Sequence, residues 1–216
     1  MTTPVMRRPK AAEPRALAGT AIAATVGLVA AGWVVAITRM SGMDMGVATK
    51  LGSFPFFLSV WVPMMAAMML PGLLPSAVRL AATWRRPFDV PSYIGSYLTV
   101  WALVGVVVYT LYRPHSPATA GAVAVAVGMY ELTPLKRRFR HLCRARAASG
   151  WELGVCCVGS CIGLMVVMLA LGAMSLTWMA AISAAVLIQK LVPPRAVIDI
   201  PLAAAMVALG LIELAR

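Results

Sequence analysis

The sequence has few charged residues for its length. Only 12% of the 216 residues are Asp, Glu, Lys or Arg, whereas a soluble domain has about 25%. Hydrophobic residues make up 61% of the chain, and the mean hydropathy is +0.86. This composition excludes an ordinary soluble domain and indicates a polytopic membrane protein. Since the apolar runs are continuous and do not alternate with polar residues, we expect the spans to be α-helices.

Acidic residues and histidines are the scarcest of the chemically active types, at seven and two. The sequence contains no recognisable Ser/His/Asp motif, no phosphate-binding glycine loop and no cluster of paired carboxylates, which argues against a hydrolase or a kinase. Both histidines, His115 and His141, lie outside the apolar runs, and a haem in a helix bundle needs its axial histidine inside a helix. We therefore predict that the protein is not an enzyme.

Negative charge is outweighed by positive charge, which gives a net charge of +12. The basic residues lie between the apolar runs, so we interpret them as determinants of membrane topology and expect no nucleic-acid partner. The sequence predicts an all-α, polytopic transmembrane helix bundle of about seven spans, or six if the last two runs form a re-entrant pair. Residues 1–14 are expected to be a disordered cytoplasmic tail and residues 15–216 a single transmembrane domain. The seven predicted spans are 16–38, 54–82, 93–112, 118–135, 151–173, 176–191 and 196–214.

The basic residues also predict the orientation. With the N-terminus in the cytoplasm and alternating spans, fifteen of the 19 Lys and Arg residues fall on the inner side and four on the outer side. This asymmetry favours a cytoplasmic N-terminus and, with seven spans, an outer C-terminus. The stretch from Lys136 to Gly150 is then a basic cytoplasmic loop, and we expect Asp199 to pair with Arg195 at the interface.

The second predicted span contains two methionine pairs between prolines, in the stretch WVPMMAAMMLP from Trp61 to Pro71. Residues at i, i+3 and i+4 share one helix face, so Met64, Met65 and Met68 lie within one arc and Met69 at its edge. Thioether sulfur is uncharged and soft, and it suits Cu(I) better than Mg²⁺ or Ca²⁺. The alternative is a flexible packing face without metal.

A second sulfur stripe is predicted on the fifth span. Cys157, Cys161, Met165 and Met168 share one face by the same spacing, whereas Cys156 points elsewhere. Two cysteines at i and i+4 can ligate one ion, although they are poorly placed for a disulfide. The alternative is that both are small apolar packing residues.

The third sulfur element is MSGMDMG from Met40 to Gly46, which we expect in a solvated outer loop. Met40, Met43 and Met45 have no packing reason there, and their spacing resembles the methionine motifs of copper importers and periplasmic copper carriers. The alternative is a polar turn, since Ser-Gly and Asp are turn formers.

The order of these motifs resembles a bacterial family of uncharacterised, predicted metal-binding integral membrane proteins. The matching pieces are WVPMMAAMMLP, YLTVWALVGV, GMYELTPLKRRFRHLCR, CCVGSCIGLM and GAMSLTWM, which together run from Trp61 to Met179. The resemblance implies metal binding and points to the four methionines of the second span, to Thr133–Lys136 and to the Cys157–Cys161 region. Two positions differ from the family's pattern: Ser160 stands where a further Cys often occurs, and Gln189 stands where an acid often precedes the Lys.

The leading hypothesis is a Cu(I)-binding protein of the bacterial inner membrane, for copper acquisition, transfer or storage. Met40, Met43 and Met45 would collect Cu(I), and Met64, Met65, Met68, Met69, Cys157, Cys161 and Met165 would hold or pass it within the bundle. The alternative is a non-catalytic accessory or assembly subunit of a larger membrane metalloenzyme, such as a copper monooxygenase or oxidase. A transporter of another small solute is a third reading, because several spans contain prolines. The expected partners are the lipid bilayer and, under the alternative reading, that larger membrane complex.

Overall fold

The computed structural model describes residues 14–41, 51–81, 83, 86, 88–113, 116–145, 149–172, 175–192 and 196–215, and within these ranges the regular structure is helical throughout. The elements are α1 (Pro14–Met40), α2 (Phe54–Met69), the 3₁₀ helix η1 (Leu70–Leu73), α3 (Leu74–Leu80), α4 (Asp89–Leu111), α5 (Pro117–Glu131), α6 (Pro134–Ala145), α7 (Gly150–Gly172), α8 (Leu176–Leu191) and α9 (Ala196–Leu214). The predicted all-α class is confirmed.

The number of spans is lower than the seven expected. Four helical segments of the described chain are long and apolar enough to cross a membrane, namely α1, the α2–α3 segment, α4 and α7, and a fifth is obtained if α5 and α6 count as one bent span. The excess lies in the last two predicted spans. α8 has 16 residues, about 24 Å of helix, whereas the hydrocarbon core is about 30 Å thick. α9 has 19 residues with Pro201 inside.

Prolines divide the second predicted span as its sequence suggests. Pro63 is accommodated inside α2, whereas the helix changes to 3₁₀ geometry at Leu70–Leu73, around Pro71, and resumes as α3 with Pro75 in its first turn. Proline lacks the N–H that would continue the helical hydrogen bonding and is tolerated best in a first turn. This break brings Gly72 and the end of α2 to the centre of the bundle.

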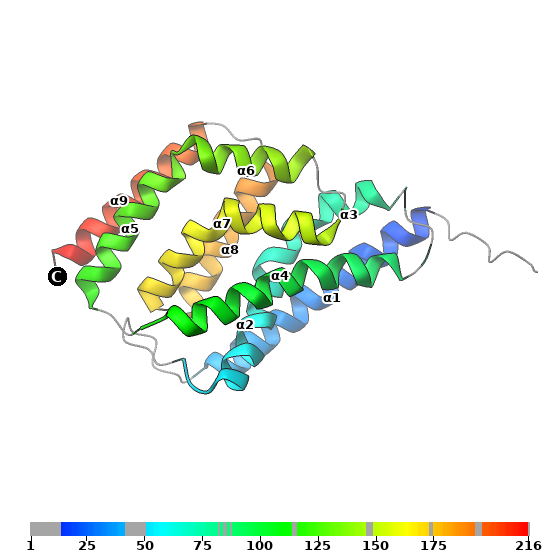
Figure 1. Ribbon diagram of the computed structural model, residues 1–216, viewed down its shortest axis with the longest axis horizontal. Helices are drawn as coiled ribbons and strands as arrows, with labels where there is room; N and C mark the ends of the chain where they lie inside the picture. The colour runs from blue at the N-terminus through cyan, green and yellow to red at the C-terminus, as the bar shows by residue number, and fades with distance from the viewer. Residues whose placement is uncertain are drawn as a thin grey trace, which may run out of the picture.

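The helices form one bundle in which α5 and α9 lie side by side at one edge, with the C-terminus next to the start of α5 (Figure 1). The two helices are antiparallel and in close backbone contact, since a Cβ on Gly121 would lie 2.6 Å from the Gly210 carbonyl oxygen and one on Gly128 would lie 3.0 Å from the Ala203 carbonyl oxygen. α7 runs through the middle of the bundle, and 67% of its most apolar stretch is buried.

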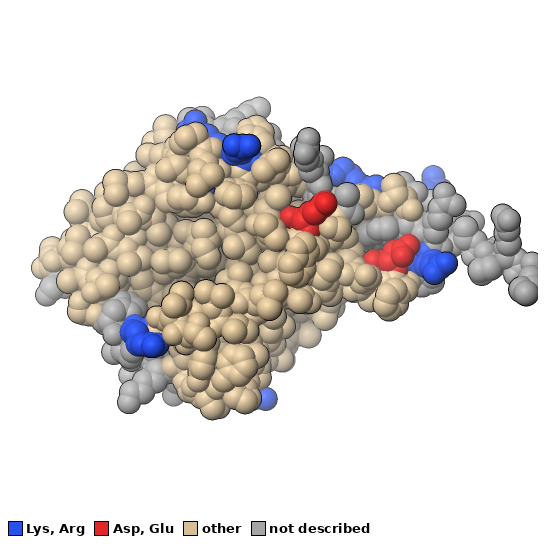
Figure 2. Space-filling view, in the orientation of Figure 1, with Lys and Arg blue, Asp and Glu red and all other residues tan. Residues whose placement is uncertain are grey.

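On the face shown in Figure 2, charge is confined to small areas. Figure 2 shows a face that is mostly uncharged, with a few Lys, Arg, Asp and Glu side chains toward its upper and right parts and one basic patch at the lower left. Exposed apolar side chains such as Leu103, Val107 and Leu211 suit contact with lipid rather than with water.

Two expectations about loops are wrong. The basic stretch that begins at Lys136 forms the helix α6 and not a loop; α6 is bent by 65° from α5 and lies across the top of the bundle in Figure 1. Met40 does not lie in the outer loop either, because it is the last residue of α1 and is fully buried. Met43, Met45 and the first 13 residues of the expected N-terminal tail lie outside the described residues.

Candidate metal site

Two cysteine thiols face each other in the interior of the bundle. Cys157 and Cys161 lie one turn apart on α7, are 0% and 2% exposed, and have their Sγ atoms 3.9 Å apart. Metal–thiolate bonds are about 2.3 Å long, so two of them span at most about 4.6 Å. One metal ion can therefore bridge this pair without a rearrangement of the backbone.

A tyrosine and a lysine from two other helices complete the surroundings of Cys157. The Tyr97 hydroxyl of α4 lies 3.1 Å from Cys157 Sγ and 3.4 Å from the Met69 carbonyl oxygen at the end of α2. Lys190 Nζ of α8 donates a hydrogen bond to the Tyr97 hydroxyl at 3.3 Å, and it also interacts with the Cys157 thiol. Residues of α4 and α8 thus surround the Cys157 thiol of α7, and α2 contacts the site through the Tyr97 hydroxyl.

The lysine reaches this position over the backbone of η1. A Cβ built on Gly72 would lie 2.0 Å from Lys190 Cδ and 2.9 Å from its Nζ, which is closer than any non-bonded contact permits. The absence of a side chain at Gly72 therefore provides the passage through which the lysine side chain enters the core.

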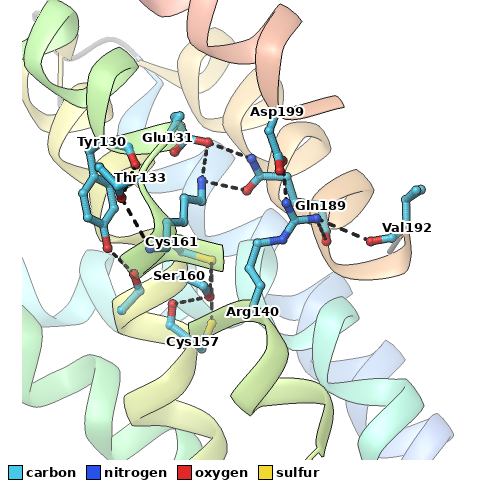
Figure 3. Close-up of polar contacts among 12 residues, drawn as sticks. Tyr130, Glu131, Thr133, Arg140, Cys157, Ser160, Cys161, Gln189, Val192 and Asp199 are labelled. Atoms are coloured by element: carbon cyan, nitrogen blue, oxygen red, sulfur yellow. Dashed lines mark hydrogen bonds and ion pairs between the residues drawn. The ribbon is translucent and has the colours of Figure 1, made fainter. Parts of the chain in front are cut away.

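The Ser160 hydroxyl, on the same helix α7, contacts both cysteines. Its hydroxyl donates to the Cys157 carbonyl oxygen at 3.0 Å and lies 3.5 Å from Cys161 Sγ (Figure 3). Hydrogen bonds from a serine to the preceding turn of its own helix are common, and this one holds the hydroxyl beside the second thiol.

The predicted methionine ligands of the second span are all buried. Met64, Met65, Met68 and Met69 are at most 3% exposed, and Met165 of α7 is 1% exposed, in the same core cluster as the cysteines. The end of α2 is linked to the cysteine pair through Tyr97, whose hydroxyl donates to the Met69 carbonyl oxygen and lies beside Cys157 Sγ. A role of the methionine sulfurs in binding metal stays a prediction.

A second buried polar cluster lies next to the site. Lys136 forms an ion pair with Glu131 and donates to the Gln189 side chain at 3.1 Å, while the Gln189 amide donates to Glu131 at 2.8 Å. The position of Gln189, where the family pattern often has an acid, is thus occupied by a neutral partner of an existing ion pair. The cluster joins the α5–α6 break to the end of α8 (Figure 3).

Asp199 of α9 pairs with Arg140 of α6, whereas the partner expected for it, Arg195, lies outside the described residues. Arg140 also donates to the Gln189 carbonyl oxygen at 2.7 Å. Asp199, which was expected at the membrane interface, is therefore buried, and its charge is compensated by Arg140, 59 positions earlier in the chain.

The donor set suits a soft ion of low coordination number. No group of three or more His, Cys, Asp and Glu side chains that could hold a metal occurs in the described part of the chain, so the four-ligand site that structural zinc prefers is not formed there. Two thiols with thioethers nearby match Cu(I).

The comparison with protein families agrees with this chemistry. The sequence model of the PpoB2 family, described as copper chaperones, matches residues 58–213. The chain belongs to this family. The matched part includes the cysteine pair, Tyr97, Lys190 and the four methionines of α2. No curated protein sequence and no solved structure matches this copper chaperone family member.

Sequence reasoning missed two residues of the candidate site, Tyr97 and Lys190. Lys190 was counted as a topology residue and noted as the neighbour of Gln189, and Tyr97 was included only as the first residue of the piece YLTVWALVGV. Their roles depend on the packing of α4, α7 and α8, and spacing within one helix carries no information about it.

Proposed function

We propose that the protein is a membrane-embedded copper chaperone that holds Cu(I) between the Cys157 and Cys161 thiolates and passes it to an acceptor. The observation that carries the proposal is the buried thiol pair, with its sulfur atoms 3.9 Å apart and Lys190 beside it. The family description, copper chaperone, supports the choice of metal.

Charge balance is the reason for a lysine at such a site. Cu(I) with two thiolates carries one net negative charge, and an isolated charge is costly to bury in a low-dielectric medium. The Lys190 ammonium offsets that charge. The Tyr97 hydroxyl can donate to the Cys157 thiolate, and hydrogen bonds to charged acceptors are the stronger ones.

The methionines would serve as a second, weaker set of soft ligands. Met64, Met65, Met68 and Met69 occupy the last two turns of α2, which ends at the Tyr97 contact. Met165 follows Cys161 by one turn of α7. Met40 ends α1, directly before the segment with Met43 and Met45. This arrangement would let Cu(I) exchange between neutral sulfur ligands without a charged intermediate ligand.

The test is the Cu(I) content of the protein purified in mild detergent under reducing conditions. We expect about one Cu(I) per chain that withstands a competing chelator, and loss of that copper in the double variant Cys157→Ala/Cys161→Ala. Cys156→Ala is the matched control, because Cys156 is half-buried on the same helix. Unchanged copper in the double variant would refute the assignment.

A separate variant tests the methionines. Met64→Leu/Met68→Leu keeps the side-chain volume and removes both sulfurs, so the packing is largely retained. If the thioethers take part in transfer, the variant keeps its tightly held copper at the cysteine pair and loads or releases it several-fold more slowly. Wild-type rates of loading and release would show that the methionines only pack.

The proposed setting is the bacterial inner membrane with a cytoplasmic N-terminus, and the proposed partner is a copper-dependent protein that receives the ion. If the protein is instead a permanent accessory subunit of a larger metalloenzyme, it will co-purify with that enzyme in a fixed ratio. A chaperone that releases its acceptor after transfer will be isolated as a single band.

A further inference from the structure

A cavity lined by several basic and hydroxyl side chains opens near the cysteine pair, where α3, α6 and α8 meet. Its volume is about 260 Å³, and its lining includes Ser76, Arg79, Arg140, Cys143, Ser160 and Lys190. A volume of this size admits a small molecule and excludes a folded protein domain.

The cavity is cationic. Its lining includes Arg79, Arg140 and Lys190 and, within the described chain, no carboxylate. Arg140 is already paired with Asp199 behind the lining, so the excess positive charge of the cavity comes from Arg79 and Lys190. Arg140 is only 6% exposed, and its Nε atom is buried without a hydrogen-bond partner, although its other two nitrogens are bonded. A buried donor without a partner destabilises the empty cavity, so this atom and the surrounding charge favour an anionic ligand.

A third thiol lines the same cavity. Cys143 of α6 is half-buried and lies within hydrogen-bonding reach of the Ser160 hydroxyl, close to Cys157 and Lys190. The same hydroxyl is 3.5 Å from Cys161 Sγ. Sulfur ligands therefore extend from the wall of the cavity to the buried pair with one serine between them.

We propose that this cavity is the docking site for a small, anionic thiolate complex of Cu(I), and that Cys143 is the first protein ligand the copper meets. The proposal rests on the function proposed above and specifies how copper reaches or leaves the buried pair. The basic residues bind the carboxylates of the carrier, and the thiol exchanges with the carrier's sulfur.

The exchange balances without a redox partner. In the first step a Cu–S bond forms to Cys143 and one Cu–S bond to the carrier breaks, and the Cys143 proton moves to the departing carrier thiolate. In the second step Cys161 replaces the remaining carrier thiol in the same way. In the third step Cys157 replaces Cys143, which recovers its proton. Copper stays Cu(I) throughout, and two carrier thiols are released for two protein protons consumed.

The experiment compares two carriers of the same sulfur chemistry and opposite charge. Purified full-length protein is mixed anaerobically with the Cu(I) complex of glutathione, which carries carboxylates, or with that of cysteamine, which carries an ammonium group. The initial rate of copper transfer is measured by rapid separation and metal analysis. Since electrostatic attraction raises association rates by about tenfold or more, we expect glutathione to deliver at least about tenfold faster.

Three variants test whether the charge of the cavity and the Cys143 thiol determine the rate of copper loading. Arg79→Gln removes one cation of the cavity and is expected to reduce the difference in transfer rate between the two carriers. Arg138→Gln removes one exposed cation of α6 outside the cavity and is expected to leave that difference unchanged. Cys143→Ser is expected to slow loading from both carriers by at least about tenfold while the final copper content stays at one per chain.

Three results would contradict the docking proposal. Equal rates from both carriers, an equal effect of Arg79→Gln and Arg138→Gln, or wild-type loading of Cys143→Ser would each overturn the docking proposal. If the double variant Cys157→Ala/Cys161→Ala still loses its bound copper, the docking proposal alone fails and the proposed function is retained. Copper that persists in that double variant would overturn both.

Discussion

At the scale of single residues, the site depends on a glycine that carries no function of its own. Lys190 reaches the thiol pair only across Gly72, where any side chain would occupy the space of the lysine's Cδ and Nζ atoms. The ammonium is the only positive charge shown in contact with the Cys157 thiol among the described residues. A side chain at position 72 would therefore remove the charge compensation by Lys190 without changing either cysteine.

This dependence gives a prediction for Gly72→Ala. The added methyl collides with the side chain of Lys190. Because that side chain is flexible, we expect the lysine to withdraw at little cost in stability, and the affinity for Cu(I) to fall at least about tenfold through loss of the charge compensation. A chelator competition measures the affinity. Gly95→Ala on α4 is the matched control, because a Cβ there has nothing within 4 Å. Equal affinities of the two variants would contradict the role of Gly72.

At the scale of elements, the break between α5 and α6 is stabilised by ionic contacts in the interior. Glu131 is the last residue of α5, Lys136 lies in the first turn of α6, and both are 1% exposed. Gln189 of α8 bonds to both. The bend thus depends on a pair of charges that water does not reach.

The pair predicts a non-additive mutational cycle. Lys136→Met leaves the Glu131 carboxylate buried without its cation and is expected to destabilise the protein by about 3–5 kcal/mol. Adding Glu131→Gln removes the uncompensated charge and should restore a large part of that loss. Thermal denaturation in detergent, followed by circular dichroism, measures both variants. Additive losses would show that the two residues do not act as a pair.

Sequence patterns predicted some elements well and others poorly, for a physical reason. The limits of α8 and α9 agree with the predicted runs 176–191 and 196–214, because the length of an apolar run can be counted from the sequence alone. α6 was missed because its arginines were interpreted as topology residues, although Phe139 and Cys143 lie one helical turn apart and face the interior in part. The Cys157–Cys161 geometry followed from helical spacing, whereas Tyr97, Lys190 and the Asp199–Arg140 pair depend on contacts between helices distant in sequence.

At the scale of the whole molecule, the direction of the helices predicts the topology. α9 is antiparallel to α5, so the end of α9 lies at the same end of the bundle as the start of α5. A reporter that is active only outside should therefore be active when fused after Leu214 and inactive when fused after Ala145. Activity at neither position would mean that the last two helices are re-entrant, and activity at Ala145 alone would reverse the orientation.

The ion pair between α6 and α9 has a consequence for the biosynthesis of the protein. Arg140 is synthesised well before Asp199, because 59 residues separate them. Until α9 arrives, the arginine is a buried charge without its acid, which favours retention of the nascent chain near the translocation machinery over release into lipid. The last helix therefore completes the electrostatic neutrality of the bundle, and quality-control proteases that recognise exposed intramembrane charge would remove chains in which α9 fails to dock.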